Sequence, residues 1–157
     1  MIDNLFPEKK VISSVCESNE ECLSNILMLI GKDRFDLDPT FSKGNFYKGT
    51  IKEPKYKFDL TPIRNDVQQA DCKNIPLPNN SIESIVFDPP FMFGTHGQTK
   101  NNIMNKRFTM FDKWQELVDM YRGGLKEFYR LLKKGRYLIF KCQDYTDSKT
   151  TMTHAIV

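Results

Sequence analysis

Residues 81–95 read SIESIVFDPPFMFGT, and this stretch decides the fold. The apolar run SIVF (84–87) is typical of a buried strand, and it leads directly into Asp88, two prolines and Phe91. Pro89 and Pro90 have fixed φ angles, and they hold the residue before them in extended geometry. The stretch therefore predicts a rigid corner at a strand end, which directs the Asp88 side chain and nearby carbonyl groups outward.

Three further short strands are predicted upstream of this corner, and each leads into an aspartate. They run to Asp38 (about 34–37), to Asp59 (about 55–59) and to Asp71 (about 66–71). A fifth strand, RYLIFKCQDY, is predicted at 136–145. Strands that alternate with helices favour an α/β fold with a parallel sheet, in which ligands bind at the carboxyl ends of the strands. We therefore expect the four acids to converge on one crevice, although each alone is also common as a turn or cap residue.

Two helices are predicted from apolar residues at helical spacing. Ser18 and Glu21 form a possible capping box for a helix over 18–30, and Gly31 provides its stop. The longer helix occupies 111–135 and carries an apolar stripe of Trp114, Leu117, Val118, Tyr121, Leu125, Phe128, Leu131 and Leu132. Its two adjacent glycines, Gly123 and Gly124, predict close packing or a kink. Lys133, Lys134 and Gly135 are predicted to end it.

The composition indicates one ordinary globular domain spanning 1–157. The chain has 157 residues, of which 39% are hydrophobic and 27% charged, enough for one sizeable core. It contains neither an apolar run of membrane-spanning length nor the pattern of a secretory leader, and its four cysteines have no CxxC spacing. We therefore expect a cytoplasmic protein with reduced thiols and without bound metal or membrane contact. The net charge of +3 permits a nucleic-acid partner but does not require one.

The residues of the corner suit one kind of ligand. Asp88 and a neighbouring carbonyl provide two acceptors, and Phe91 adds a flat face beside them. This combination suits a planar group with an exocyclic amine, whose two N–H groups meet the acceptors while its ring stacks on the phenylalanine. Positioning of this kind can supply much of a rate enhancement. A nucleobase flipped out of its duplex fits this description.

The motif DPPF (88–91) resembles the catalytic motif of the S-adenosylmethionine-dependent amino-methyltransferases. These enzymes methylate adenine N6, cytosine N4, guanine N2 or a glutamine amide. The resemblance extends over about 34–141 and implies a Rossmann-like class I methyltransferase fold, with helices on both faces of an open, mostly parallel sheet. It also implies a catalytic set of Asp88, Pro89, Pro90 and Phe91.

Upstream segments resemble the parts of this family that bind the cofactor. DPTFSKGNF (38–46) is similar to the family's loop DPxxGxGxx, except that Ser42 stands where a glycine is usual. FDLTP (58–62) resembles the segment whose acid holds the cofactor ribose, and the run from 70 resembles the segment that meets the cofactor adenine. The resemblance thus implies S-adenosylmethionine bound by Asp38, Pro39, Phe41, Ser42, Gly44, Asp59, Asp71 and Cys72.

A polar, basic loop follows the corner, FMFGTHGQTKNNIMNKRF (91–108). Lys100, Lys106 and Arg107 are predicted to contact substrate phosphates, and an ordinary solvated surface loop is the alternative. His96 is not needed as a base, because the amine can lose its proton to solvent after attack. Lys141, at the end of the fifth strand, is interpreted as a capping or surface residue, with substrate contact as the alternative.

The function favoured by these motifs is DNA adenine N6 methylation, because Asp at the first motif position is associated in this family with adenine or guanine. The alternatives are an RNA methyltransferase acting on guanine N2 or adenine N6, and a non-catalytic scaffold with a methyltransferase fold. No segment is large enough for a separate target-recognition domain, so a partner subunit is one possible source of specificity. The family's sheet has seven strands, and residues 145–157 are too few for the last two, so we expect a fragment or an unusually short domain.

Overall fold

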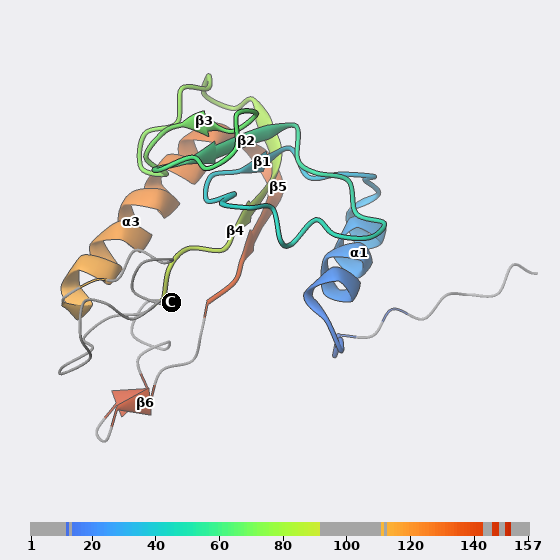
Figure 1. Cartoon of the computed structure of the whole chain (residues 1–157), viewed down its shortest axis with the longest axis horizontal. Helices are drawn as coiled ribbons and strands as arrows, with labels where there is room; N and C mark the ends of the chain where they lie inside the picture. The colour runs from blue at the N-terminus through green and yellow to red at the C-terminus, as the bar shows by residue number, and fades with distance from the viewer. Residues whose placement is uncertain are drawn as a thin grey trace, which may run out of the picture. The chain divides into compact units, whose positions relative to one another are not determined.

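The computed structural model describes residues 12, 14–91, 111 and 113–142, and the backbone of 146–147 and 150–151. Its main sheet has five strands. Its strands are β1 (Leu37–Asp38), β2 (Tyr56–Asp59), β3 (Gln68–Gln69), β4 (Ile82–Phe87) and β5 (Leu132–Phe140). Their order is β3-β2-β1-β4-β5, and every neighbouring pair is parallel (Figure 1). The predicted α/β class and parallel sheet are confirmed, and this strand order is compatible with a Rossmann-like fold.

The chain forms two compact units. The first contains Met1–Arg34 and Gly44–Glu53, and the second contains Phe35–Lys43 and Pro54–Val157. The first unit holds α1 (Asn19–Ile30), which begins and ends as predicted. Ser18 Oγ accepts a hydrogen bond from Glu21 N (3.1 Å), and Gly31 ends the helix with a φ of 65°. The Glu21 carboxylate accepts from Glu17 N rather than from Ser18 N, so only half of the capping box forms.

In the second unit, α3 (Trp114–Leu131) packs its apolar stripe against the sheet. The Phe128 ring meets the ring of Phe87 on β4 edge-on, with centroids 4.7 Å apart. The helix is continuous through the glycine pair, and a Cβ at Gly124 would lie 3.4 Å from the rings of both phenylalanines. At this distance an added Cβ would make ordinary van der Waals contacts, so the packing around Gly124 is close but does not itself require a glycine. Neither described helix combines the length and apolar character that crossing a membrane requires.

The predicted end of this helix is wrong, because Lys133, Lys134 and Gly135 lie in β5. The last carbonyl groups of α3 are bound by the chain that enters β4: Asn80 N donates to Arg130 O and Ser81 N to Leu131 O, both at 2.9 Å. A glycine cap is therefore not needed. Gly135 has a φ of 73° instead within β5, where the pairing with β4 shifts register. The fifth strand thus begins earlier than predicted, and it ends at Phe140.

Two very short strands follow β5. These are β6 (Thr146–Asp147) and β7 (Thr150–Thr151), which pair antiparallel in a separate sheet.

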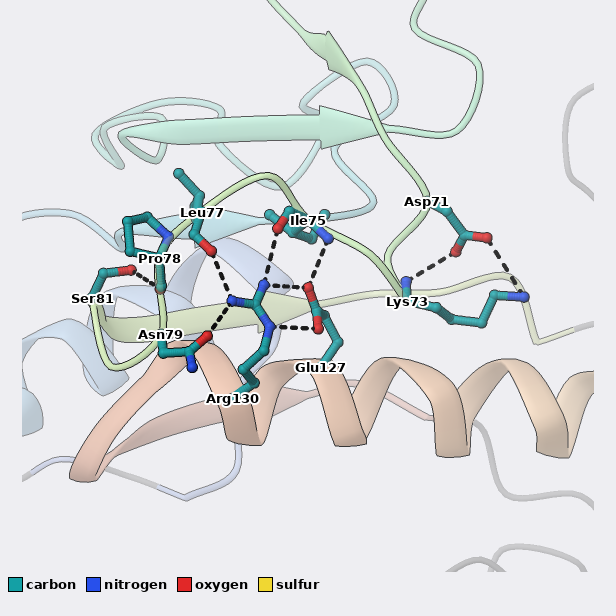
Figure 2. Close-up of polar contacts among 9 residues, drawn as sticks. All are labelled: Asp71, Lys73, Ile75, Leu77, Pro78, Asn79, Ser81, Glu127 and Arg130. Atoms are coloured by element: carbon teal, nitrogen blue, oxygen red, sulfur yellow. Dashed lines mark hydrogen bonds and ion pairs between the residues drawn. The ribbon is translucent and has the colours of Figure 1, made fainter.

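A clamp of two side chains on α3 fixes the loop between β3 and β4 (Figure 2). Arg130 donates to the carbonyl oxygens of Ile75 (3.0 Å) and Leu77 (2.8 Å) and to Asn79 Oδ1 (2.7 Å). It also pairs with Glu127, whose Oε1 accepts from Ile75 N at 2.8 Å. The hydrogen bond from Arg130 is the main cause that lowers the pKa of the buried Glu127 carboxyl, and the Ile75 N–H adds to it.

We expect Arg130→Met to reduce the free energy of unfolding by about 2–3 kcal/mol, because it removes the Arg130 donors of the Glu127 carboxylate and of two carbonyl groups. Folding lowers the pKa of Glu127 below its ordinary value of 4.5. The pair therefore stabilises the fold at pH values above 4.5, and this stabilisation is lost as the pH falls through the lower pKa of the folded state. Urea unfolding from neutral to acid pH measures both effects. Arg122→Met, at an exposed position of the same helix, is the control. Equal losses in the two variants would contradict the clamp.

Candidate functional site

The site lies where the strand order of the sheet changes direction. β1 and β4 are neighbours, but the chain continues from β1 towards β2 on one side and from β4 towards β5 on the other. Asp38 is the last residue of β1, and Asp88 follows the last residue of β4. In open α/β sheets, ligands bind at the carboxyl ends of the strands at such a point. Two of the four predicted acids therefore flank the most favourable position in the sheet.

The three upstream acids share one local contact. In each, a carboxylate oxygen accepts a hydrogen bond from the backbone N–H two residues later, which is the geometry of an Asx turn. These bonds join Asp38 to Thr40 (2.8 Å), Asp59 to Thr61 (2.9 Å) and Asp71 to Lys73 (2.9 Å). Asp38, Asp59 and Asp71 therefore act as turn residues, as single aspartates often do.

Asp88 differs, because the residue two positions later is Pro90, which has no N–H to donate. Its Oδ1 atom is buried and accepts no hydrogen bond from any residue that the structure describes. The Lys141 ammonium lies 3.6 Å from Oδ1, close enough for an ion pair but too far for a hydrogen bond. Burial raises the pKa of Asp88, and the Lys141 charge opposes this rise. The two prolines therefore leave one strand-end carboxylate with unused acceptor capacity.

The loop after β1 connects three of the four acids. The Thr40 hydroxyl donates to Asp38 Oδ1 (3.4 Å) and accepts from the backbone N–H of Asp88 (3.3 Å). Ser42 N donates to Asp59 Oδ2 at 2.9 Å. Ser42 has a φ of 51°, in the left-handed region that favours glycine, and this is the position where the sequence departs from the expected glycine. Hydrogen bonds made by this one loop therefore link Asp38, Asp59 and Asp88.

The ring positions at this edge differ in burial. Phe41 is 3% exposed, with the Lys57 ammonium and the Arg64 guanidinium 5.4 Å and 5.1 Å from its ring centroid, so it is a packing residue. Pro39 and Pro89 are fully buried. Pro90 and Phe91 are only partly buried.

Among the described residues, no hydrogen bond or ion pair joins the other predicted cofactor residues, Gly44, Asp71 and Cys72, to the carboxylates of Asp38, Asp59 and Asp88. Asp71 forms a local turn, and its Oδ2 lies 3.5 Å from Lys73 Nζ (Figure 2). The neighbouring Cys72 is buried, and burial, assisted by the Asp71 charge, raises its pKa to about 12, so its thiol stays protonated. Gly44 belongs to the other compact unit and has a φ of 73°.

The predicted substrate contacts lie outside the described residues. These are Lys100, Lys106 and Arg107, together with His96. Their roles stay predictions.

Three residues at the corner were not assigned to the site from sequence: Thr40, Tyr121 and Lys141. Tyr121 was assigned to the core by its helical spacing, and its ring does pack against Phe140 at 5.1 Å. Burial is the main cause that raises its pKa to about 12, with the nearby charges of Cys142 and Asp88 adding to it. The one signal for Lys141 in the sequence was its position at the end of the predicted fifth strand. In the structure its backbone N–H donates to Phe87 O, at the end of β4, at 2.9 Å.

Comparisons with protein-family models, with curated proteins and with solved structures found no match for this chain. Within the described residues, no group of three or more His, Cys, Asp or Glu side chains could hold a metal ion.

Pro90→Ala tests whether the missing N–H of Pro90 explains why Asp88 Oδ1 accepts no hydrogen bond from the described residues. The substitution restores an N–H two residues after Asp88, so we expect an Asx turn to form there as at the other three acids. A hydrogen bond to the charged form lowers a carboxyl pKa, and we expect the pKa of Asp88 to fall in this variant. Carbon-13 NMR of aspartate side-chain carboxyls measures it, with Asp88→Ala to assign the resonance. An unchanged Asp88 pKa in a folded Pro90→Ala protein would contradict this explanation.

Proposed function

We propose that this chain is an S-adenosylmethionine-dependent methyltransferase that acts on an exocyclic amine of a nucleobase, adenine N6 of DNA in the favoured case. One observation carries the proposal: the Asp88 carboxylate, at the point where the strand order changes direction, has a buried oxygen that accepts no hydrogen bond from the described residues. An unused buried acceptor has a cost in folding, and such costs persist where a ligand provides the missing donor. The DPPF motif supports the same function.

Recognition of the amine follows from the geometry of the corner. Asp88 Oδ1 accepts one N–H of the amine, and the Pro89 carbonyl is proposed to accept the other. The partly exposed ring of Phe91 stacks on the base. The two prolines hold these groups in place before substrate arrives, so little ordering remains to be done on binding. The amine lone pair is then directed towards an electrophile.

The residues around the loop after β1 fit S-adenosylmethionine, which when bound supplies a methyl group on a positively charged sulfur. Asp59 is only partly buried, and each of its oxygens accepts one backbone N–H, which leaves lone pairs for ribose hydroxyl groups. Asp38 and Phe41 are buried, so we propose that they shape the loop rather than touch the cofactor. The resemblance assigns the cofactor adenine to Asp71 and Cys72, and the neutral Cys72 thiol is compatible with an uncharged ring.

The predicted class I methyltransferase fold is part of this proposal. A Rossmann-like class I methyltransferase carries helices on both faces of its sheet, and the strand order β3-β2-β1-β4-β5 is compatible with that arrangement. Asp at the first motif position favours adenine, and the net charge of +3 is compatible with a nucleic-acid substrate.

Methyl transfer from labelled S-adenosylmethionine tests the proposal. The chain is incubated with DNA and, separately, with RNA, each is digested to nucleosides, and the product is identified by mass. Label on adenine N6 of DNA supports the proposal, and label on RNA alone changes the substrate but keeps the mechanism. A thermal-shift titration with the cofactor runs in parallel, because ligand at a hundredfold its dissociation constant stabilises by about 2.7 kcal/mol. If the chain neither transfers methyl groups nor binds the cofactor, the proposal is overturned and a non-catalytic scaffold is favoured.

A further inference from the structure

Lys141 is the cation beside the unused oxygen of Asp88, and its place is fixed by the sheet. It follows directly after β5, and its backbone N–H donates to Phe87 O at 2.9 Å, which extends the pairing of β5 with β4 to the corner. Its ammonium lies 3.6 Å from Asp88 Oδ1. The backbone therefore holds a positive charge next to the carboxylate without satisfying it by a hydrogen bond.

Within the described part of the chain, few charges near Asp88 could replace Lys141. Among the residues that the structure describes, the titratable groups near Asp88 are Asp38, joined through Thr40, Tyr121 on α3, and Lys141, which Cys142 follows in the chain. Asp38 is an acid, and a Tyr121 with a pKa of about 12 is neutral at physiological pH. Among these groups, only Lys141 favours the charged form of Asp88 through an opposite charge.

A second observation separates this pair from an ordinary surface ion pair. The Asp88 side chain is 29% exposed and its Oδ1 is buried, whereas the Lys141 side chain is 45% exposed. The carboxylate is therefore partly shielded from water, and the ammonium can remain hydrated. At 3.6 Å the ammonium leaves the lone pairs of Oδ1 open to a better-placed donor, such as an amine N–H.

We propose that Lys141 is a positioning residue that keeps the Asp88 carboxylate charged and ready to accept a hydrogen bond, without occupying its acceptor sites. The consequence for methyl transfer rests on the proposed function, whereas the effect of Lys141 on Asp88 does not. A protonated Asp88 presents an O–H where the amine needs an acceptor. The proposed reaction should therefore slow as the pH falls through the Asp88 pKa, and loss of Lys141 should move that fall to higher pH.

The experiment compares Lys141→Met, Lys141→Gln and Lys141→Arg with wild type. Carbon-13 NMR of aspartate carboxyls follows the titration of Asp88, and Asp88→Ala assigns its resonance. We expect Asp88 to titrate about one pH unit higher in the Met and Gln variants, the lower end of the effect of an opposite charge at this distance. Lys141→Arg keeps the charge and should restore the wild-type titration. Lys134→Met removes an exposed lysine from β5 itself and should leave Asp88 unchanged.

Methyl transfer at several pH values completes the test. We expect the acid limb of kcat/KM to move upward with the Asp88 titration in Lys141→Met and Lys141→Gln, and to return in Lys141→Arg. An unchanged Asp88 titration in the folded Met and Gln variants would overturn the inference, whether or not the wild type is active. An inactive wild type would count against the proposed function alone, because the NMR titration would still decide the role of Lys141.

Discussion

Asp88→Ala is expected to lower methyl transfer by about a hundredfold or more, while the variant stays at least as stable as wild type. The loss of activity follows from the role of Asp88 as a prearranged acceptor for the amine, since removal of one such group costs about 10²–10³ in rate. The stability follows from the structure. Asp88 Oδ1 has no hydrogen bond to lose among the described residues, and the cost of burying the charged carboxylate offsets its attraction to Lys141, 3.6 Å away.

The pH dependence of this comparison has a definite sign. Because burial raises the pKa of Asp88, the folded protein binds that proton more tightly than the unfolded chain does. The charged carboxylate therefore costs stability as the pH rises through the two pKa values, and this cost is absent at acid pH. We expect Asp88→Ala to gain stability relative to wild type as the pH is raised from about 4 to 7.

Asp38→Ala is the matched control for Asp88→Ala. Its carboxylate accepts from both the backbone N–H and the hydroxyl of Thr40, so we expect a loss of about 1–3 kcal/mol where Asp88→Ala loses none. Urea unfolding measures stability, and labelled methyl transfer measures activity. An Asp88→Ala protein that is destabilised as much as Asp38→Ala would mean that the corner is structural. Full activity in a folded Asp88→Ala protein would remove Asp88 from the proposed mechanism.

Phe128→Ala is expected to reduce the free energy of unfolding by about 3–5 kcal/mol, the largest loss of stability that we predict. Phe128 is 0% exposed, and its ring meets Phe87 with centroids 4.7 Å apart. Gly124, one turn earlier on α3, leaves no Cβ to fill the space that the ring would vacate. The cavity therefore cannot collapse easily, and the transfer and cavity contributions add.

Tyr129→Ala provides the control for this substitution, since the two aromatic residues are adjacent on the same helix. Tyr129 is 88% exposed, so its truncation should change the free energy of unfolding by less than about 0.5 kcal/mol. Chemical denaturation with urea compares the two variants with wild type. Similar small losses in both would mean that Phe128 does not anchor α3 to the sheet. Loss of the contact between Phe128 and Phe87 is also expected to disturb the position of Asp88, because Phe87 directly precedes Asp88.

Several parts of this protein can be predicted from the sequence because they depend on local chemistry. Helix α1 begins at Ser18 and stops at Gly31 because a hydroxyl cap and a left-handed glycine act within a few residues. The short strands before Asp59 and Asp88 were predicted because apolar runs that end in turn residues carry their own signal. The α/β class followed from the alternation of these elements, which needs no knowledge of contacts.

Other features depend on partners that are distant in the sequence, so they become visible only in the folded chain. The end of α3 was mispredicted because the chain that enters β4 supplies donors to the carbonyl groups of Arg130 and Leu131, from 50 residues away in the sequence. Basic residues and a glycine were therefore not needed there. Four aspartates look alike in the sequence, and three of them satisfy themselves by a local bond. Only the folded chain places a buried oxygen of Asp88 beside Lys141, because two prolines withhold the local donor while the sheet brings the end of β5 alongside.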